Sequence, residues 1–420
     1  MKILLDITPL GNGYKNNGGR CGIHRVVVET IKAMAADPKM DFYCTTMGSL
    51  DAEAKTFWAL QSLGESFENR FRSMRTRNAF IHGILMWAKG IHFASMEFKR
   101  YNPIRLAAAA FCRILGILFP VRPGTEKWDV YHSTFHELHQ GVRAKSRILY
   151  VYDAIPAKFP EFFPENSGEQ WWKNVRSLNQ ADDIIICNSN STKNDLLSLG
   201  ILDPQRIFSV PLGVDKRFNP NTIPAEGYQK IKEKYSIPNG RWIFTLSAIE
   251  PRKNLASVIT AMKMISSTHP DIKLVIGGPY GWKMENFLEK TANDAELKNK
   301  IVFTGFIDDD DLPAVYSNAP CFVYASFYEG FGLPPIEALA CGAPVIASST
   351  SSMPEVLGDG ALYINPHEPS TIAAAITEVF DKPLKTLKRA QIGKDIAKKM
   401  EWDAFMKRIH SLYLKTGPAQ

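Results

Sequence analysis

The sequence predicts an α/β fold in which parallel sheets carry helices on both faces. In the C-terminal half, short apolar runs typical of strands alternate with segments of helical periodicity, and this alternation favours a parallel sheet. The chain has 420 residues, enough for two or three domains. A stretch with few apolar repeats lies between the two halves of the chain. We therefore predict an N-terminal domain over 1–212, a linker over 213–240 and a C-terminal domain over 241–400.

The composition excludes several other classes of protein. Hydrophobic residues make up 45% of the chain and charged residues 22%, so the chain is neither disordered nor a small disulfide scaffold. The sequence has no apolar run of the roughly 18 residues that a membrane-spanning helix needs. Its start, MKILLDI, lacks the long apolar core of a signal peptide. The six cysteines are scattered, as expected in a reducing compartment, so we expect a cytoplasmic protein.

The N-terminal half is predicted to begin with a strand, a glycine-rich loop and a helix. Lys2–Asp6 has strand character, and apolar residues follow at helical spacing over 23–36. Further strands are predicted over 130–132, 147–151 and 183–187. After the last of these strands, we expect Ser189 to cap a helix that continues over 193–199.

The C-terminal half is predicted to alternate regularly between strands and helices. The strands are expected over 242–248, 272–277, 301–306, 321–325, 345–348 and 361–364. The helices are expected over 254–266, 282–293, 310–318, 335–340 and 369–380, with a last amphipathic helix over 401–413. Parallel strands end at one edge of their sheet, and ligands bind in the crevice beyond these carboxyl ends. The loops that follow the strands are therefore the candidate site segments.

The positive charge of the chain is concentrated in one segment. The net charge is +7, but residues 70–122 contain ten Lys or Arg and one acidic residue, so this segment carries +9 and the rest −2. Trp, Phe and Leu are interleaved with these cations, which is typical of helices that lie on an anionic membrane surface. Two alternatives remain open. The segment could form core helices with solvated basic flanks, or it could contact nucleic acid, although no binding motif accompanies the charge.

The strongest candidate site is the string Glu329-Gly-Phe-Gly-Leu-Pro-Pro-Ile-Glu337, which follows the strand predicted over 321–325. Gly330 and Gly332 allow a tight loop and close approach of the backbone to a ligand. Pro335 suits the first turn of a helix, which places Glu337 in that turn. A carboxylate there can accept hydrogen bonds from vicinal hydroxyls, such as those of a ribose. The alternative is that it only complements the helix dipole.

This string resembles the E-x7-E signature of retaining glycosyltransferases of the GT-B fold, in family 4, the large group 1 class. Other blocks match the family in order and spacing, and together they cover about 242–380. These blocks are Glu250-Pro-Arg-Lys-Asn-Leu255, Gly277-Gly278, Thr304-Gly305-Phe306, Ala340-Cys-Gly-Ala-Pro-Val345, Pro354-Glu355-Val356 and Gly358-Asp-Gly-Ala361. The N-terminal half matches more weakly. The resemblance implies two Rossmann-like domains facing each other across a cleft, with residues 401–420 crossing back to the N-terminal domain.

The resemblance also implies roles for individual residues. Arg252 and Lys253 correspond to the segment that binds the donor phosphates, where charge grows as the glycosidic bond breaks. Two cations at that place stabilise the transition state more than the ground state. Glu329 is expected to meet the sugar. The residues expected to bind the donor are Gly19, Gly22, Phe306, Gly330, Phe331, Gly332, Leu333 and Glu337.

Two N-terminal segments are further candidates. Gly19 and Gly22 lie in a loop between the first strand and a helix, where backbone N–H groups can face phosphate. Tyr152 and Asp153 follow the strand over 147–151. Family members often have His-Asp there, so the role of that histidine does not transfer to Tyr152. Asp153 is expected either to orient the acceptor or sugar, as a catalytic residue, or to cap a helix.

We expect no metal and no other cofactor, because protein cations can offset the charge of the leaving group. His132, His136 and His139 are close in sequence, but the resemblance supports no metal site there. His132 ends a predicted strand and is expected near the cleft. The acidic run 308–311 is interpreted as a helix N-terminal cluster, because it lacks the strand-flanked Asp-x-Asp of metal-dependent transferases.

The activity implied by the resemblance is transfer of a hexose, with mannose preferred, from a GDP- or UDP-sugar with retention of configuration. The acceptor would be a saccharide or a polyprenyl-linked saccharide in surface polysaccharide assembly, at the inner face of the plasma membrane. No nucleic acid partner is expected. Two alternatives stay open: a sugar-nucleotide epimerase or phosphorylase of the same fold, and a non-catalytic nucleotide-sugar-binding module. Sugar transfer that depends on an acceptor distinguishes among these hypotheses.

Overall fold

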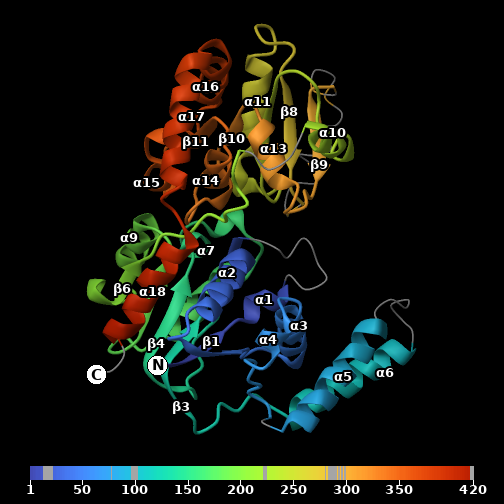
Figure 1. The fold of residues 1–420 in the computed structure, drawn as a ribbon, viewed down its shortest axis with the longest axis vertical. Coiled ribbons are helices and arrows are strands. Elements are labelled where there is room, and N and C mark those ends of the chain that lie inside the picture. Colours follow the sequence, from blue (N-terminus) through green and yellow to red (C-terminus); the bar gives the residue numbers. More distant parts are fainter. Residues whose placement is uncertain are drawn as a thin grey trace.

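Two parallel six-stranded sheets, one in each half of the chain, form the framework of the molecule (Figure 1). The computed structural model describes residues 1–12, 22–76, 78–95, 103–220, 225–279, 281, 291, 294, 297 and 299–416. Every strand pair in the two sheets is parallel. The predicted α/β fold with two Rossmann-like domains is therefore confirmed.

The N-terminal sheet has the strand order β2-β1-β3-β4-β5-β6. This is the doubly wound order of flavodoxin-like sheets with one more strand at its end. Its strands are β1 (Lys2–Asp6), β2 (Asp41–Thr45), β3 (Lys127–Ser133), β4 (Arg143–Val151), β5 (Ile184–Cys187) and β6 (Ile207–Ser209). The central strands are buried on both faces, as their near-continuous apolar sequences require.

The C-terminal sheet has the order β12-β11-β10-β7-β8-β9. Counted from its own first strand, this is the 3-2-1-4-5-6 order of a Rossmann sheet. Its strands are β7 (Trp242–Leu246), β8 (Lys273–Gly277), β9 (Ile301–Gly305), β10 (Phe322–Tyr324), β11 (Val345–Ser348) and β12 (Ala361–Ile364). Each lies within or beside a range predicted as a strand, because short runs of β-branched and aromatic residues bounded by turn residues identify buried strands well.

Helices cover both faces of each sheet (Figure 1). In the N-terminal half they are α1 (Thr8–Asn12), α2 (Gly22–Ala36), α3 (Leu50–Gln61), α4 (Glu65–Glu68), α5 (Ala79–Ser95), α6 (Pro103–Leu118), α7 (Ile155–Lys158), α8 (Ser167–Arg176) and α9 (Asn190–Ser198). In the C-terminal half they are α10 (Ala225–Lys234), α11 (Leu255–Met264), α13 (Leu312–Asn318), α14 (Leu333–Ala340), α15 (Met353–Leu357), α16 (Pro369–Asp381), α17 (Pro383–Ala397) and α18 (Trp402–Thr416). Ser189 caps α9 as predicted, since its hydroxyl accepts the N–H of Thr192.

The sequence did not indicate some of these elements. β2, α3 and α17 were not predicted, and the stretch over 213–240 that we predict as linker contains α10. Ile231 of this helix and Tyr235 and Ile237 after it are buried, and α10 contacts α13, so part of that stretch packs with the C-terminal domain. The helix expected over 282–293 lies largely outside the described residues.

The helices α5 and α6 form a hairpin that projects from the N-terminal domain (Figure 1). Its inner face joins a small separate core made of Leu50, Ala54, Leu85, Met86, Ala88, Cys112 and Leu115. Both helices lie in the basic segment identified from the sequence. Among the described residues, no helix is long and apolar enough to cross a membrane.

The chain passes twice between the domains, and the two passages run side by side. The backbone N–H of Val214 donates to the carbonyl of Met400 at 2.8 Å. α18 then follows and lies against α2 and β4 of the N-terminal domain (Figure 1). Its apolar stripe is buried there, with Phe405, Ile409 and Tyr413 at most 2% exposed.

Candidate active site

The candidate site lies where two neighbouring strands of the C-terminal sheet end. β7 and β10 pair through Phe244 and Phe322, although β8 and β9 separate them in the chain. Such a reversal of strand order is a topological switch point, and ligands bind in the crevice beyond it. The segment 250–253 follows β7, and the loop over 326–332 follows β10. The switch point therefore brings the two predicted site segments together.

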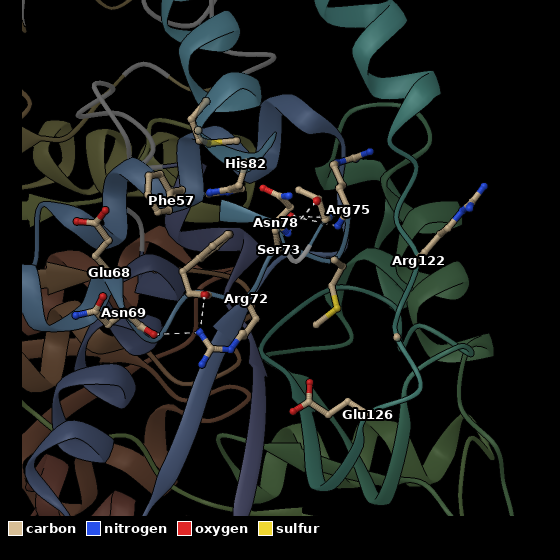
Figure 2. A pocket seen from close by; sticks show the side chains of 16 residues that line it. Phe57, Glu68, Asn69, Arg72, Ser73, Arg75, Asn78, His82, Arg122 and Glu126 are labelled. Atoms are coloured by element: carbon tan, nitrogen blue, oxygen red, sulfur yellow. Dashed lines mark hydrogen bonds between the residues drawn. The ribbon is translucent and has the colours of Figure 1, made fainter. Parts of the chain in front are cut away.

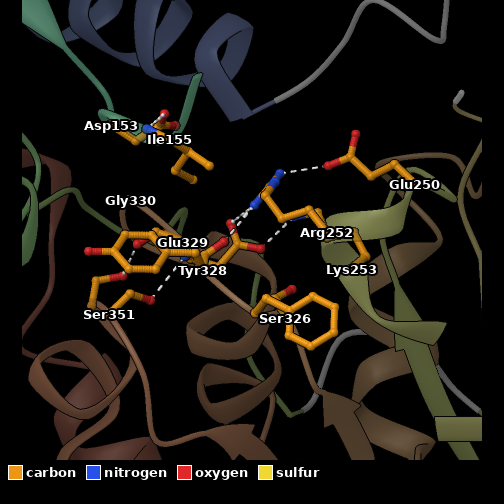
Figure 3. A network of polar contacts seen from close by, with 12 residues as sticks. Asp153, Ile155, Glu250, Arg252, Lys253, Ser326, Tyr328, Glu329, Gly330 and Ser351 are labelled. Carbon is orange, nitrogen blue, oxygen red and sulfur yellow. Dashed lines mark hydrogen bonds and ion pairs between the residues drawn. The ribbon is translucent and has the colours of Figure 1, made fainter. Parts of the chain in front are cut away.

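Arg252 and Lys253 both contact the carboxylate of Glu329 (Figure 3). Arg252 Nη1 lies 2.8 Å from Glu329 Oε2, and Lys253 Nζ lies 2.6 Å from Oε1. Arg252 also pairs with Glu250 at 2.7 Å, and Lys253 donates to the hydroxyl of Tyr324 at 2.8 Å. Three of the four predicted catalytic side chains thus form one ion-pair cluster. Glu250 and Tyr324, its other members, were not predicted.

The protonation of this cluster follows from burial and mutual charge. Burial raises the pKa of Glu329, but the charges of Arg252 and Lys253 outweigh it and hold that pKa at about 2. The pKa of Arg252 is raised, because the carboxylates of Glu329 and Glu250 overcome the effect of burial. Burial and the charge of Arg252 lower the pKa of Lys253. The lysine is therefore the cation whose charge is least firmly held.

The N-terminal domain is in direct contact with the loop over 326–332. A side chain at Gly330 would place its Cβ 2.2 Å from the carbonyl oxygen of Tyr152, so only glycine fits there. The hydroxyl of Ser189 donates to the carbonyl of Gly330 at 2.6 Å. Asp153 lies half-buried beside this contact, where loss of hydration raises its pKa and the charge of Arg252 lowers it. Its carboxylate also accepts the N–H of Ile155 at 3.0 Å, although the N-cap of α7 is Ala154, and the expected role of Asp153 toward the acceptor or sugar stays a prediction.

Glu337 is buried and paired with a residue of the opposite domain. The guanidinium of Arg25, from α2, donates to the Glu337 carboxylate and lies 3.3 Å from Asp309. Burial raises the pKa of Glu337 to about 7, against the charge of Arg25, which lowers it. The prediction that Glu337 lies in the first turn of its helix was wrong, because α14 begins at Leu333 and Glu337 is its fifth residue. A carboxylate beyond the first turn gains little from the helix dipole.

The other predicted donor-binding residues occupy different positions around the site. Gly22 opens α2, where an added Cβ would lie 3.4 Å from Leu333 across the domain junction. Gly332 precedes α14 with φ +89°, a conformation that favours glycine. The side chains of Phe331 and Leu333 are buried in the main core, which leaves their backbone as the part that can face a ligand. Phe306 directly follows β9 and is half-buried. Gly19 lies outside the described residues.

Several contacts between the domains were not predicted from the sequence. Phe162 stacks on Phe327, with ring centroids 5.7 Å apart. The Tyr328 hydroxyl lies 2.9 Å from both carboxylate oxygens of Asp195. Glu355 accepts the first backbone N–H groups of α9, from residues 190 and 191, at 2.8 and 3.1 Å. A single sequence gives no signal for such pairs, because each joins residues more than 130 positions apart.

Comparison with known proteins identifies the class of enzyme. The family model for "Glycosyl transferases group 1" matches residues 228–399, which include the whole C-terminal sheet and the site segments. Residues 228–399 thus match a group 1 glycosyltransferase domain, and together with the similarity to known transferases they identify the chain as a glycosyltransferase. This glycosyltransferase also matches the solved structure of Anabaena HepE in complex with UDP and glucose, with a TM-score of 0.63 and 16% identity, over 98% of this chain and 99% of that one. That likeness confirms the predicted GT-B fold.

Curated relatives of this glycosyltransferase include transferases of Escherichia coli. It is 28% identical to O-antigen chain mannosyltransferase B over 319 residues, which cover 74% of this chain and 80% of that protein. It is 30% identical to the serotype-specific mannosyltransferase WbdA over 257 residues, which cover 59% of this chain and 31% of that protein. The chain therefore spans less than a third of the length of WbdA.

Two groups of residues considered as metal ligands have other partners in the glycosyltransferase. His132 is buried, and its Nδ1 lies 2.6 Å from the hydroxyl of Tyr413 in α18. The expectation that His132 lies near the cleft was therefore wrong, because α18 covers it. Asp308 and Asp311 bind Lys234 and precede α13, as expected of a helix N-terminal cluster. Within the described ranges, no group of three or more His, Cys, Asp or Glu is arranged to hold a metal ion.

A cavity of about 810 Å³ lies away from this site, at the base of the α5–α6 hairpin (Figure 2). Its walls come mainly from the end of α4 and the segment that follows it, from α5 and from the segment over 122–126. They include the side chains of Phe57, Arg72, Arg75, His82, Arg122 and Glu126. Its arginines belong to the basic segment and not to the cluster around Glu329.

Proposed function

We propose that this glycosyltransferase moves a hexose, preferably mannose, from a nucleotide sugar to a saccharide acceptor with retention of configuration. The observation that carries the proposal is the cluster of Arg252, Lys253 and Glu329 at the switch point of the C-terminal sheet, with Asp153 of the other domain beside it. Two adjacent cations at the carboxyl ends of parallel strands suit the diphosphate of a nucleotide sugar.

The proposed reaction uses these cations on the leaving group. As the bond between the anomeric carbon and the phosphate oxygen breaks, negative charge grows on the diphosphate. Arg252 and Lys253 offset that charge more in the transition state than in the bound donor. The acceptor oxygen attacks from the same face, and its proton passes to the departing phosphate. This route retains the configuration and needs no carboxylate as a covalent nucleophile.

Glu329 has a supporting role in this scheme. Without it, two neighbouring cations would repel each other in a site of low dielectric. Its carboxylate bridges them at 2.8 and 2.6 Å and thereby fixes both before the donor arrives. Glu337 would take the ribose hydroxyls, for which it must exchange its partner Arg25. Because the two protein cations perform the electrostatic work, we expect turnover to persist in the presence of EDTA.

The proposed donor is GDP-mannose, with UDP-sugars as the next candidates. Mannosyltransferases of Escherichia coli among the relatives support the choice of mannose. The proposed acceptor is a saccharide or a polyprenyl-linked saccharide in surface polysaccharide assembly, and the proposed place of work is the inner face of the plasma membrane. The name of the relative that builds O-antigen chains supports this choice of pathway.

Product analysis tests the proposal. A panel of GDP- and UDP-sugars, each with and without saccharide acceptors, is incubated with the protein, and products are examined by mass spectrometry and by NMR of the anomeric proton. We expect a hexose adduct that forms only with acceptor and keeps the donor configuration. Conversion of the donor without acceptor indicates an epimerase, and an inverted product contradicts the retaining route.

Variants of the two cations test the roles of the side chains. We expect Arg252→Ala and Lys253→Ala each to reduce turnover by roughly 10²–10³-fold, the usual cost of removing a group that stabilises developing charge. Each variant also removes one of the two cations that contact the buried carboxylate of Glu329, which lowers stability. The double variant Lys253→Ala with Glu329→Gln is the control, because it restores the charge balance of the fold without restoring the cation. Turnover near wild type in Lys253→Ala would refute the assignment.

A further inference from the structure

The α5–α6 hairpin carries most of the large hydrophobic side chains that are exposed among the described residues. Of the fourteen exposed large hydrophobic side chains in the described part of the chain, nine belong to these two helices. We call these nine side chains the outer apolar face. They are Phe80, Ile84, Trp87 and Ile91 of α5 and Leu106, Phe111, Ile114, Ile117 and Leu118 of α6. Exposed apolar side chains gathered in this way on two packed helices mark an interaction site.

The exposed apolar residues of α5 recur at the spacing that places side chains on one side of a helix. In α5 they fall at i, i+4, i+7 and i+11, which is a single line along a helix. The side chains of Trp87 and Ile117 are 65% and 78% exposed, so neighbouring residues leave most of their surface open to solvent. The opposite side of α5 carries Leu85 and Met86 into the small core beneath. The hairpin therefore has two apolar faces, of which the body of the protein uses only one.

The hairpin is held firmly on its inner side. Arg75 pairs with Glu53 at 2.9 Å and Lys89 pairs with Asp51 at 2.9 Å, so these cations are already neutralised by the body. Neither α5 nor α6 contains an acidic residue, whereas Arg113 is exposed on α6. The cavity at the base of the hairpin adds the exposed Arg122, from the segment that follows α6 (Figure 2). The outer apolar face thus has cations and no acids around it on its own helices.

We propose that the outer apolar face inserts into the surface of an anionic lipid bilayer. The proposal deepens the proposed function and rests on its membrane-linked acceptor. Helices that combine an apolar stripe, an interfacial tryptophan and basic residues lie in the plane of the lipid headgroups. The helices α5 and α6 have 17 and 16 residues and do not qualify as spanning helices, which agrees with lying in that plane.

A second copy of the chain fits the face less well than lipid. A two-fold dimer would bring the same surface of each copy together. Neither α5 nor α6 contains an acidic residue and Arg113 is exposed on α6, so such a dimer would bring cations of the two copies together without a counter-charge on these helices. Anionic headgroups instead complement that charge. The apolar and the electrostatic features of the hairpin therefore favour the same partner.

Vesicle sedimentation tests the proposal with the full chain. Wild type is mixed with vesicles of phosphatidylcholine alone or with phosphatidylglycerol added, and the bound fraction is measured after centrifugation. We expect binding to be roughly tenfold tighter to the anionic vesicles. The variant Trp87→Ser with Ile117→Ser should bind these vesicles at least about tenfold more weakly, because it removes apolar area that inserts.

The matched control replaces two exposed leucines on the other domain. Leu384 and Leu387 of α17 are 77% and 63% exposed, and Leu384→Ser with Leu387→Ser should bind vesicles as wild type does. Equal binding by both double variants, or no binding by wild type, overturns the proposal. A dimer in light scattering that Trp87→Ser with Ile117→Ser converts to monomer also overturns it, in favour of a second copy. Transfer to a soluble saccharide should be unchanged in both variants, so a failure of the proposed function appears in that assay and not in vesicle binding.

Discussion

Glu329 and Glu337 lie eight positions apart in one loop and helix, yet their carboxyl groups have opposite surroundings. Two cations of the same domain surround Glu329 and hold its pKa at about 2. Glu337 has one cationic partner, from the other domain, and burial raises its pKa to about 7. Paired titratable groups whose surroundings separate their pKa values are typical of functional sites. Glu329 therefore stays ionised at every physiological pH, whereas the charge of Glu337 depends on pH.

We expect the KM for the donor to rise about tenfold when the pH falls from 8 to 6. Ribose hydroxyls donate to the ionised form of Glu337, and that form disappears as the pH falls through about 7. Initial rates at several donor concentrations and pH values measure this change. Glu337→Gln is the control, because its KM should be high and nearly constant over this range. A donor KM in wild type that does not change with pH contradicts the ribose contact.

The raised pKa of Glu337 affects stability in the opposite direction to donor binding. In the folded protein the pKa of Glu337 is above its ordinary value of 4.5, so the folded state binds the proton more tightly than the unfolded state. The contribution of Glu337 to the free energy of unfolding is thus complete below about pH 4.5 and is lost as the pH rises through 7. The pH that favours donor binding is therefore the one at which this carboxyl stabilises the fold least.

At the residue scale, the sequence predicted which side chains form the cluster of the C-terminal domain, but not which residues of the two domains contact each other. Arg252, Lys253 and Glu329 could be placed together, because the two segments that carry them each follow a strand of one parallel sheet. The contact between Arg25 and Glu337 could not be derived in this way. It depends on how two domains pack, and no periodicity or spacing within one sequence encodes that distance.

At the scale of elements, the loop over 326–332 joins the ion-pair cluster of the C-terminal domain to the surface of the N-terminal domain. The loop follows β10 and carries Glu329, whose carboxylate binds the two cations. Its Gly330 then lies against Tyr152, which follows β4, and α14 begins at Leu333. The strands around it were predicted well, since buried parallel strands have short apolar sequences. β2, α3 and α17 were missed because mixed sequences such as DFYCT in β2 give a weak period, and tertiary packing decides their structure.

We expect Gly330→Ala to reduce kcat/KM by about 10²-fold while the protein stays folded. The added Cβ would lie 2.2 Å from the carbonyl oxygen of Tyr152 and 2.9 Å from Cβ of Asp153, so the loop and the N-terminal domain must move apart. A displacement of about 1 Å at a reacting site has a cost of this size. Gly83→Ala is the control, because an added Cβ there has no heavy atom within 4 Å. The kcat/KM and the thermal melting temperature of both variants are measured. A fully active Gly330→Ala would show that the contact between Gly330 and Tyr152 is not needed for activity.

At the scale of the whole molecule, α18 follows the C-terminal domain in sequence but packs on the N-terminal domain. The passage over 400–402 runs beside the passage over 213–214, where an added Cβ on Gly213 would lie 2.4 Å from the backbone of Trp402. The two crossings form a narrow double connection between large domains, and this arrangement suits domain closure around a ligand. α18 then buries its apolar stripe on α2 and β4, so the two domains share one helix as well as one site.

Replacing Tyr413 measures how much this helix contributes to the stability of the N-terminal domain. Its ring is fully buried, and its hydroxyl lies 2.6 Å from Nδ1 of His132, whose pKa burial lowers to about 3. We expect Tyr413→Phe to lower the free energy of unfolding by about 1–2 kcal/mol, because a buried ring nitrogen loses its partner. Tyr413→Ala should cost about 3–5 kcal/mol, because it also leaves a cavity. Urea unfolding measures both changes.

Leu414 provides the matched control for this series, since it is the next residue of α18 and is 55% exposed. Leu414→Ala should change the free energy of unfolding by no more than about 0.5 kcal/mol. If Tyr413→Ala is as stable as Leu414→Ala, α18 does not hold the N-terminal domain, and its packing there has no energetic consequence. If instead the variants rank as expected while donor KM stays at the wild-type value, the helix acts on the fold and not on the site. The stability of the N-terminal domain then depends on residues of α18, more than 350 positions further along the chain than α2.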